Sequence, residues 1–205
     1  MKKNLSQALA ITAFPLVLAI GIITIPVVAD YSNHQYAIEA ASQSGRWFWG
    51  HLISATGFGI ALLAAASINR FIPEKTRLRW LVLPLMAIGA ALYAFGLGAD
   101  GIGPLAAASG AGGALDYFEF SGNWISGVFV TASLIFGAGL ITQVACVNRC
   151  GLLKGYWRWV AFIGALVFLG GSAIPSGWGL YVVAGAAMLI YIPISLAVLR
   201  SAPSI

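Results

Sequence analysis

Six long apolar segments, separated by shorter polar ones, set the hydrophobic pattern of this chain. They cover residues 8–29, 47–68, 80–98, 123–147, 159–174 and 178–199. A helix crosses the hydrocarbon core of a bilayer with about 20 apolar residues, at a rise of about 1.5 Å each. The second segment, 47–68, contains no Asp, Glu, Lys or Arg. The pattern therefore predicts six membrane-spanning helices.

The composition supports the same fold class. Of the 205 residues, 60% are hydrophobic and 8% are charged, whereas soluble domains carry roughly 25% charged residues. So many apolar side chains need lipid as their solvent. We expect an all-α integral membrane helical bundle, formed as a single transmembrane domain over residues 1–205 and in contact with the lipid bilayer.

The first apolar segment has an alternative interpretation as a signal peptide. Small residues at 27–29 precede Asp30 at the spacing of a cleavage site. The segment is nevertheless longer than the roughly 7–15 residues of a signal h-region. We therefore expect it to be retained as the first span.

The polar segments differ in charge. Residues 30–45 and 99–122 are predicted outer loops, the second either re-entrant or lying on the membrane interface, and residues 69–79 and 148–158 are predicted inner loops. Ten of the eleven basic residues, all except Arg46, fall at the termini or in the inner loops, and five of the six acids fall in the outer loops. The positive-inside rule then places both termini in the cytoplasm, and we expect the chain to lie in the cytoplasmic (inner) membrane of a prokaryote.

Other features agree with this topology. The net charge of +5 reflects anchoring at the inner face, and no nucleic-acid partner is expected. Cys146 and Cys150 lie near a predicted cytoplasmic end, where thiols stay reduced. Tryptophans stand at the ends of predicted spans, where an indole prefers the headgroup layer; these are Trp47, Trp49, Trp80, Trp159 and Trp178.

A shift of 79 residues aligns the two predicted inner loops. The identities are Asn69-Arg70 with Asn148-Arg149, Lys75 with Lys154, and Arg79-Trp80 with Arg158-Trp159. One interpretation is a duplicated helical hairpin, in which the second and third spans recur as the fourth and fifth. The other is the general preference for Arg and Trp at inner boundaries. His51 has no histidine counterpart, because the shift lands on Val130.

His51 is the one Asp, Glu, Lys, Arg or His residue within a predicted span. An ionisable residue at membrane depth usually has a function. On a helix, His51 shares a face with Trp47, and we predict that His51, Trp47 and Asn123 contact a small ligand at the outer ends of the second and fourth spans. The alternative is that His51 forms a hydrogen bond between helices.

Imidazole and carboxylate groups also gather on the predicted outer side. His51, His34, Asp30 and Asp100 form a candidate site for zinc or a similar divalent metal, and the same groups could act as acid and base. These ligands would come from separate segments, because the chain contains no HxxxH, HExxH or CxxC motif. The alternative is a solvated acidic surface.

These patterns favour a non-catalytic membrane component that binds a small apolar or lipid-like ligand, or a partner subunit, at its outer face. Two alternatives stay open. One is a membrane-embedded, metal-dependent enzyme with an outer-face His/carboxylate site, and the other is a passive channel or facilitator for a neutral solute, lined by the fourth span. An ion-coupled transporter is disfavoured, because no Asp, Glu, Lys or Arg lies within a predicted span.

One block of the sequence has a distinctive order. It consists of Asp30, a polar loop, Gly45-Arg46-Trp47, His51-Leu52, Gly57 and an Ala-rich tail before the first inner loop. This block, about a fifth of the chain, resembles a group of small multi-pass prokaryotic membrane proteins of uncharacterised function. The resemblance implies a six-span helical bundle and implies no activity.

Overall fold

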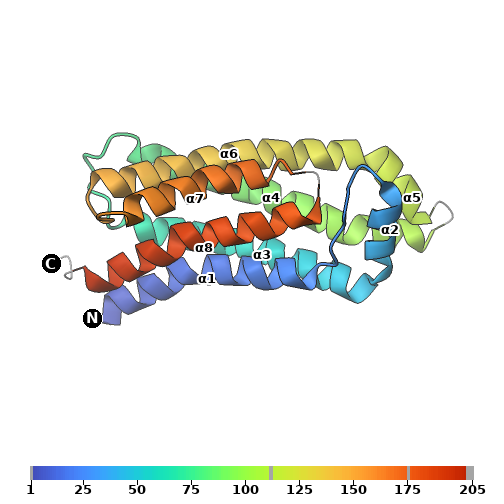
Figure 1. Cartoon of the computed structure of the whole chain (residues 1–205), viewed down its shortest axis with the longest axis horizontal. Helices are drawn as coiled ribbons and strands as arrows, with labels where there is room; N and C mark the ends of the chain where they lie inside the picture. Colours follow the sequence, from blue (N-terminus) through green and yellow to red (C-terminus); the bar gives the residue numbers. More distant parts are fainter. Residues whose placement is uncertain (1, 111–112, 175, 202–205) are drawn as a thin grey trace.

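The computed structural model describes residues 2–110, 113–174 and 176–201, and these residues form helices and no strand. The helices are α1 (Lys2–Thr24), α2 (His34–Ser42), α3 (Ser44–Asn69), α4 (Arg79–Ala108), α5 (Gly113–Asp116), the π-helical turn η1 (Tyr117–Ser121), α6 (Gly122–Arg149), α7 (Trp157–Gly171) and α8 (Gly177–Arg200) (Figure 1). The predicted all-α fold class is confirmed for this part of the chain.

Five of these helices are long and apolar enough to cross a membrane, namely α1, α3, α4, α6 and α8. The chain is therefore a multi-pass membrane protein whose apolar helices contact the bilayer. Helix α7 is equally apolar but has only 15 residues. At a rise of about 1.5 Å per residue it is about 22 Å long, which is shorter than the roughly 30 Å hydrocarbon core.

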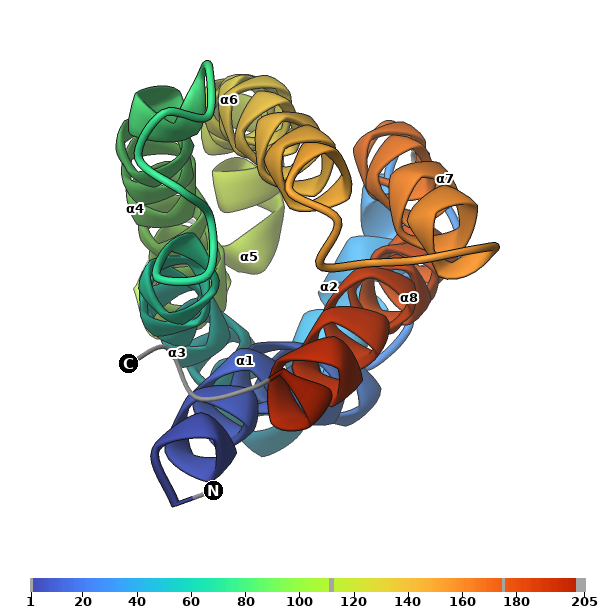
Figure 2. The same ribbon diagram turned by 90° about the vertical axis from the view of Figure 1, so that its left-hand side faces the viewer.

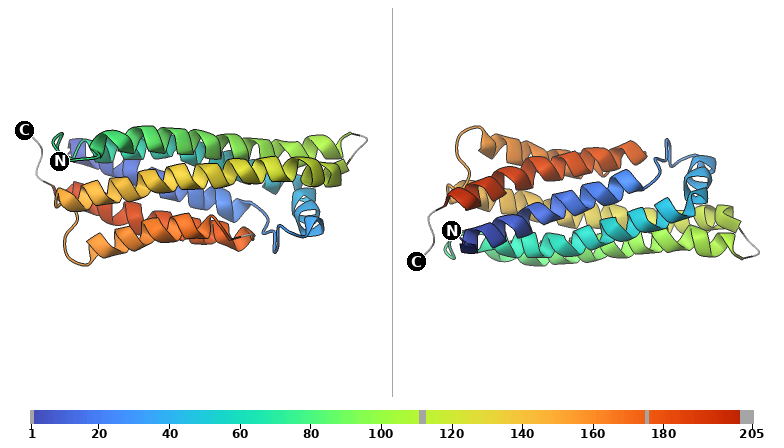
Figure 3. Two further views of the ribbon diagram at one scale, coloured as in Figure 1. Left: turned by 90° about the horizontal axis from the view of Figure 1, so that it is seen from above. Right: turned by 90° about the horizontal axis from the view of Figure 1, so that it is seen from below.

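Six helices form a closed ring around the long axis of the molecule. Each of α1, α3, α4, α6, α7 and α8 packs against the next in that order, and α8 packs against α1 (Figure 2). The six lie side by side along the long axis, with α2 lying across one end (Figure 3). The middle of the ring is thus the place where all six helices can contribute side chains.

An aromatic layer fills the middle of the ring, and each of the six helices supplies one member. The members, none more than 6% exposed, are Phe14, Phe58, Tyr93, Phe136, Phe168 and Tyr191. The rings of Phe58 and Tyr93 stack with centroids 4.1 Å apart, and Phe14 meets Tyr191 edge-on at 5.0 Å. Both are favourable geometries for aromatic pairs, and each joins neighbouring helices, whereas the edge-on contact of Phe14 with Phe136 at 6.0 Å crosses the ring from α1 to α6.

Glycines allow the closest helix pairs to approach. Gly50 of α3 lies against α1, and a Cβ added to it would be 2.5 Å from Cγ1 of Ile25. Gly89 of α4 lies against α6, and a Cβ there would be 2.6 Å from the backbone nitrogen of Phe136. Between helices in lipid, such close van der Waals packing replaces the hydrophobic driving force.

The two ends of the bundle differ. At one end lie the beginning of α1, the loops 70–78 and 150–156, and the end of α8 (Figure 1). We call this the basic end, because it carries all but one of the basic residues of the chain. At the other, the acidic end, lie α2, α5 and η1.

Two predicted loops are largely helical. Helix α4 does not end at residue 98 but continues to Ala108, and α5, η1 and the start of α6 occupy most of the rest of the predicted loop 99–122, of which residues 111–112 lie outside the described part. The predicted loop 30–45 contains α2, which is capped by Asn33 Oδ1 accepting a hydrogen bond from the backbone N–H of Gln35 at 3.1 Å. The Gly- and Ala-rich composition of residues 99–122 predicted a loop, but in the structure these small residues let helices pack closely.

The remaining boundaries differ less. The first predicted span ends at Thr24 rather than residue 29, because Pro26 lacks an N–H and disfavours helical backbone at the residue before it. Helix α7 covers Trp157–Gly171 where residues 159–174 were predicted. Ser176 caps α8 by accepting from the backbone N–H of Trp178 at 3.3 Å.

Each of the two aligned loops has a hydrogen bond between equivalent positions. The Nε–H of Arg79 donates to Asn69 Oδ1 at 3.3 Å, and the Nδ2–H of Asn148 donates to the backbone carbonyl of Arg158 at 3.2 Å. Each bond links the end of one helix to the start of the next at positions related by the shift of 79. The duplicated hairpin itself stays a prediction.

Replacing Gly89 with alanine should destabilise the bundle, because the new methyl group would overlap the α6 backbone at Phe136. Overpacking of this kind costs about 1–3 kcal/mol, so we expect Gly89→Ala to lower the melting temperature of the detergent-solubilised protein by several degrees. Gly98→Ala on the same helix is the control, since a Cβ there meets nothing within 4 Å. Equal melting temperatures for the two variants would contradict the packing argument.

Candidate functional site

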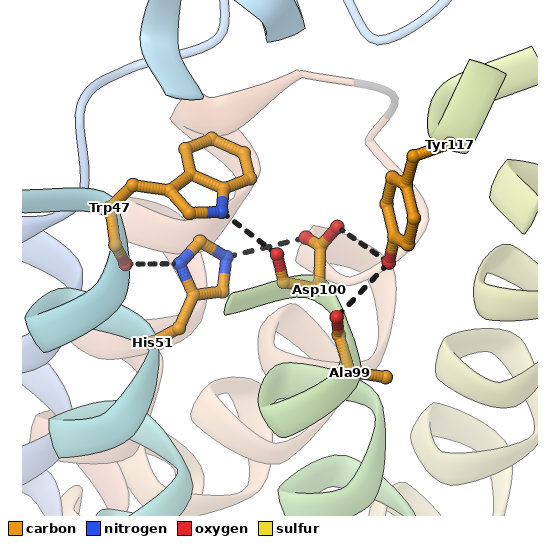
Figure 4. A network of polar contacts seen from close by, with 5 residues as sticks. All are labelled: Trp47, His51, Ala99, Asp100 and Tyr117. Atoms are coloured by element: carbon orange, nitrogen blue, oxygen red, sulfur yellow. Dashed lines mark hydrogen bonds and ion pairs between the residues drawn. The ribbon is translucent and has the colours of Figure 1, made fainter. Parts of the chain in front are cut away.

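A buried polar network joins α3, α4 and η1 at the acidic end. Trp47 and His51 come from successive turns of α3, Asp100 comes from the far half of α4, and Tyr117 is the first residue of η1 (Figure 4). His51 lies about 27 Å from the end of α3 at Asn69, counting 1.5 Å per residue. The network therefore lies about one hydrocarbon-core thickness, roughly 30 Å, from the basic end of α3.

The contacts of His51 define where its protons must be. Its Nδ1 lies 2.7 Å from the backbone carbonyl oxygen of Trp47, and a carbonyl can only accept, so Nδ1 carries a proton. Its Nε2 lies 3.3 Å from Oδ2 of Asp100. If the ring were neutral and Asp100 ionised, an unprotonated Nε2 would face an unprotonated carboxylate oxygen. Both atoms are hydrogen-bond acceptors, so they would repel each other.

A second proton resolves this conflict. It lies either on Nε2, giving an imidazolium–carboxylate ion pair, or on Asp100, giving a carboxylic acid that donates to a neutral ring. The two side chains are only 4% and 16% exposed, so water cannot readily replace either partner. The His51–Asp100 pair is thus a largely buried polar contact between α3 and α4.

Trp47 holds both members of the pair in place. Its indole Nε1–H donates to the backbone carbonyl of Asp100 at 2.8 Å, and its ring lies 4.5 Å from the His51 ring, centroid to centroid. Trp47 is fully buried within the protein, and its place at the level of the headgroups stays a prediction. The other four tryptophans predicted there are 57–73% exposed, as an interfacial position requires; these are Trp49, Trp80, Trp159 and Trp178.

Two phenols border Asp100. The hydroxyl of Tyr117 lies 3.2 Å from the carbonyl oxygen of Ala99 and 3.5 Å from Oδ1 of Asp100, and it donates to one of them at a time (Figure 4). Burial, and then the negative charge of Asp100, raise the pKa of Tyr117 far above the ordinary value of 10.0. The same two causes raise the pKa of Tyr31. Both phenols therefore stay neutral hydrogen-bond donors at ordinary pH.

Glycine is required next to the pair. A Cβ on Gly101 would lie 2.7 Å from Cβ of His51. A Cβ on Gly103 would overlap the ring of Tyr117. Because glycine at these positions lets α4 approach both α3 and η1, Asp100 can reach a histidine on a different helix.

A small second core covers the pair. It consists of Val28, Ala37, Ala40, Ala41 and Trp47, with Tyr31, Leu105 and Phe118 packed against it. It is separate from the main core of the bundle. We call α2, α5 and η1 together the cap; α2 supplies three alanines of this cluster and η1 supplies Phe118.

The structure brings together part of the predicted residue set. His51, Trp47 and Asp100 are in contact, as described above. His34 instead lies beside the ring of Phe118, with centroids 6.5 Å apart. The side chain of Asn123 lies outside the described residues.

Asp30 is engaged locally. It accepts from the backbone N–H and the hydroxyl of Ser32 at 2.8 and 2.7 Å, and these hydrogen bonds lower its pKa. Among the described residues, no three His, Cys, Asp or Glu side chains are placed to hold a metal ion. The predicted four-residue metal site is thus not assembled in this arrangement, because the turn after α1 engages Asp30 and α2 carries His34 to Phe118.

Sequence reasoning missed Tyr117 and Tyr31. Tyr117 belongs to the acidic-aromatic segment that follows the Gly-rich stretch, and Tyr31 directly follows Asp30. Neither position has a periodicity that points to Asp100. The usable signal was the spacing of Asp100, Gly101 and Gly103, which suits a helix that packs closely against neighbours.

Comparison with known proteins adds no relative. A scan against protein-family models, a search of curated proteins and a search of solved structures each returned no match.

Nitrogen NMR of labelled histidine can test the proton arrangement, because the chain has only two histidines and His34→Asn assigns the signals. We expect Nδ1 of His51 to be protonated whenever its ring is neutral. In Asp100→Asn, the amide N–H donates to Nε2, so we expect Nε2 to become a simple acceptor. Asp116→Asn, an exposed residue at the same end, should leave the His51 signals unchanged. An unprotonated Nδ1 in the wild type would contradict the assignment.

Proposed function

We propose that this chain is a non-catalytic multi-pass protein of a prokaryotic cytoplasmic membrane that binds a small lipid-like ligand, or a partner subunit, at its acidic end. The observation that carries the proposal is the buried, hydrogen-bonded His51–Asp100 pair beneath a cap of short helices. In this proposal six helices cross the membrane, both termini are cytoplasmic and the cap faces outward. The prokaryotic assignment rests on the resemblance of residues 30–68 to small prokaryotic membrane proteins.

The connectivity supports six crossings. Helix α6 ends at the basic end, whereas α8 begins at the acidic end, where the N–H of Gly177 donates to the carbonyl of Val28 at 2.7 Å. The chain must therefore return between Arg149 and Gly177, and α7 is the helix that does so. Although α7 is short, Trp159 at its start is 69% exposed and suits a headgroup-level anchor.

The charge distribution supports the orientation. The loops 70–78 and 150–156 carry Lys and Arg, and the cap carries Glu39, Asp116 and Glu119. Short basic loops stay on the cytoplasmic side. The cap would then lie outside, where pH and solute composition vary most.

Thiol labelling can test this orientation. In a background without Cys146 and Cys150, we expect a membrane-impermeant maleimide to label Glu39→Cys in intact cells, because this residue is exposed on α2. Lys75→Cys, exposed in the loop 70–78, should be labelled only after lysis. The reverse pattern would invert the proposed topology.

The build of the cap supports ligand binding. Helix α5 has four residues and η1 has five, and helices this short gain little stability from their own hydrogen bonds. The cap can therefore open at modest cost, as binding segments often do. Opening would expose Trp47, His51, Asp100 and the two phenols, an aromatic and polar surface suited to a ligand with an apolar body and a polar head.

The two other predicted functions receive less support. A metal-dependent enzyme needs more ligands than the His51–Asp100 pair supplies. A facilitator needs an open path, whereas the aromatic layer fills the middle of the ring in this structure. We therefore retain ligand binding at the acidic end.

Mass spectrometry of extracts from the purified protein can test the ligand proposal. We expect one lipid-like species in near-stoichiometric amount with the wild type, and about tenfold less with Asp100→Asn, since a hydrogen bond to a charged group contributes about 1.5–3 kcal/mol. Asp116→Asn removes the same charge from an exposed position of the cap and should retain the species. Equal retention by both variants, or no bound species in any sample, would contradict the proposal.

A further inference from the structure

A cavity at the basic end is separate from the His51–Asp100 network. It has a volume of about 220 Å³ and is lined by Asn69, Glu74, Thr76, Arg79, Trp80 and Leu83. We call it the basic-end pocket. Drug-sized ligands occupy roughly 300–1,000 Å³, so this pocket suits a smaller polar group.

The pocket lies at the start of a membrane-length helix, where we expect the lipid headgroups. Arg79 and Trp80 open α4, and the long apolar stretch of that helix starts at the same point. Trp80 is 73% exposed, as expected for an indole at the membrane interface. Leu83, one turn further along α4, forms the wall on the hydrocarbon side. A polar group in this pocket would be within reach of acyl chains.

The lining carries one charge of each sign. The Arg79 Nη1 lies 3.9 Å from Oε1 of Glu74, which is beyond hydrogen-bond distance. The guanidinium has five N–H donors, of which Nε–H is used by Asn69. The Glu74 side chain is 96% exposed. Both charges can therefore bind a ligand without first breaking a strong ion pair.

The two charges prefer ligand groups of opposite sign. The backbone N–H groups of Arg79 and Leu81 already donate to the carbonyls of Thr76 and Leu78 at 3.2 and 3.0 Å, so the preference for an anion rests on the guanidinium of Arg79. Arg79 thus favours a phosphate on one side of the pocket, and Glu74 favours a cation on the other.

From this arrangement we infer that the basic-end pocket binds the headgroup of a glycerophospholipid that carries both a phosphate and a primary ammonium, as phosphoethanolamine does. The phosphate accepts hydrogen bonds from Arg79, and the ammonium donates to Glu74. Trp80 lies beside this ammonium and offers a cation–π surface. A trimethylammonium group cannot donate to Glu74, and an uncharged glycerol head has no cation for it, so the pocket selects against both.

Native mass spectrometry in the presence of defined lipids tests this inference. We expect the wild type to retain phosphatidylethanolamine several-fold better than phosphatidylcholine or phosphatidylglycerol with the same acyl chains. Arg79→Gln should reduce retention of phosphatidylethanolamine about tenfold, because a charge-assisted bond to the phosphate is lost. Glu74→Gln should abolish only the preference for the ethanolamine head.

Two matched controls accompany these variants. Arg77→Gln removes the same charge from an exposed residue of the same loop that does not line the pocket, and Glu39→Gln removes an exposed acid at the opposite end. Both should behave as the wild type. Equal retention by Arg79→Gln and Arg77→Gln, or an unchanged preference in Glu74→Gln, would overturn the inference.

A final experiment distinguishes a lipid ligand from a soluble phosphate ester. We expect glycerophosphoethanolamine, which has the same head without acyl chains, to fail to displace bound phosphatidylethanolamine at equal concentration. Displacement at equal concentration would show that the pocket takes a soluble ester and would overturn the lipid assignment. Because Glu74 is fully exposed to solvent on a loop, its variant should fold normally, which keeps the test decisive even if Arg79→Gln is unstable.

Discussion

The proton between His51 and Asp100 is the constraint on which the acidic end depends. Nδ1 of His51 is committed to the carbonyl of Trp47, so the ring can meet a carboxylate only when a second proton is present. That requirement links α3 to α4. Trp47 strengthens the link through the Asp100 carbonyl, and the cap then packs on Trp47. The acidic end is thus held together by a chain of polar and apolar contacts that runs from Asp100 through His51 and Trp47 to the cap.

The sequence predicted the architecture well and the site only in part. Long apolar runs and one-sided charge follow from the physics of the bilayer, so the long helices and the unequal ends could be derived without a structure. The extension of α4 beyond residue 98 could not be derived in this way. A segment rich in glycine and alanine is typical of a loop unless the helices that pack against it are known. Once α3 and η1 are in place, Gly101 and Gly103 are required. Asp100 can pair with His51 only because α4 continues past residue 98. The sequence therefore predicted only that the two residues lie on the same side of the membrane.

The aromatic layer explains how one small bundle can keep two different ends. It joins all six helices of the ring in the middle, and its stacked and edge-on contacts are well packed. A rearrangement of the cap need not pass through this layer, because the cap has its own small core. Likewise, the basic-end pocket is built from the first turn of α4 and the preceding loop, so its occupancy leaves the layer intact. The molecule is thus arranged as a rigid middle with separate polar sites at its two ends.

The energetics of buried charge argue that the His51–Asp100 pair is present for a function. Burying two ionisable groups incurs a desolvation penalty that their attraction repays only with excellent geometry, and well-packed apolar replacements are often as stable or more stable. The 3.3 Å separation of Nε2 and Oδ2 is longer than the roughly 2.7–2.9 Å of a strong charge-assisted bond. Stability alone would therefore be served as well by an apolar pair between α3 and α4. A hydrogen-bonded polar pair supplies what an apolar pair cannot, which is a directional contact that fixes how α3 and α4 face each other.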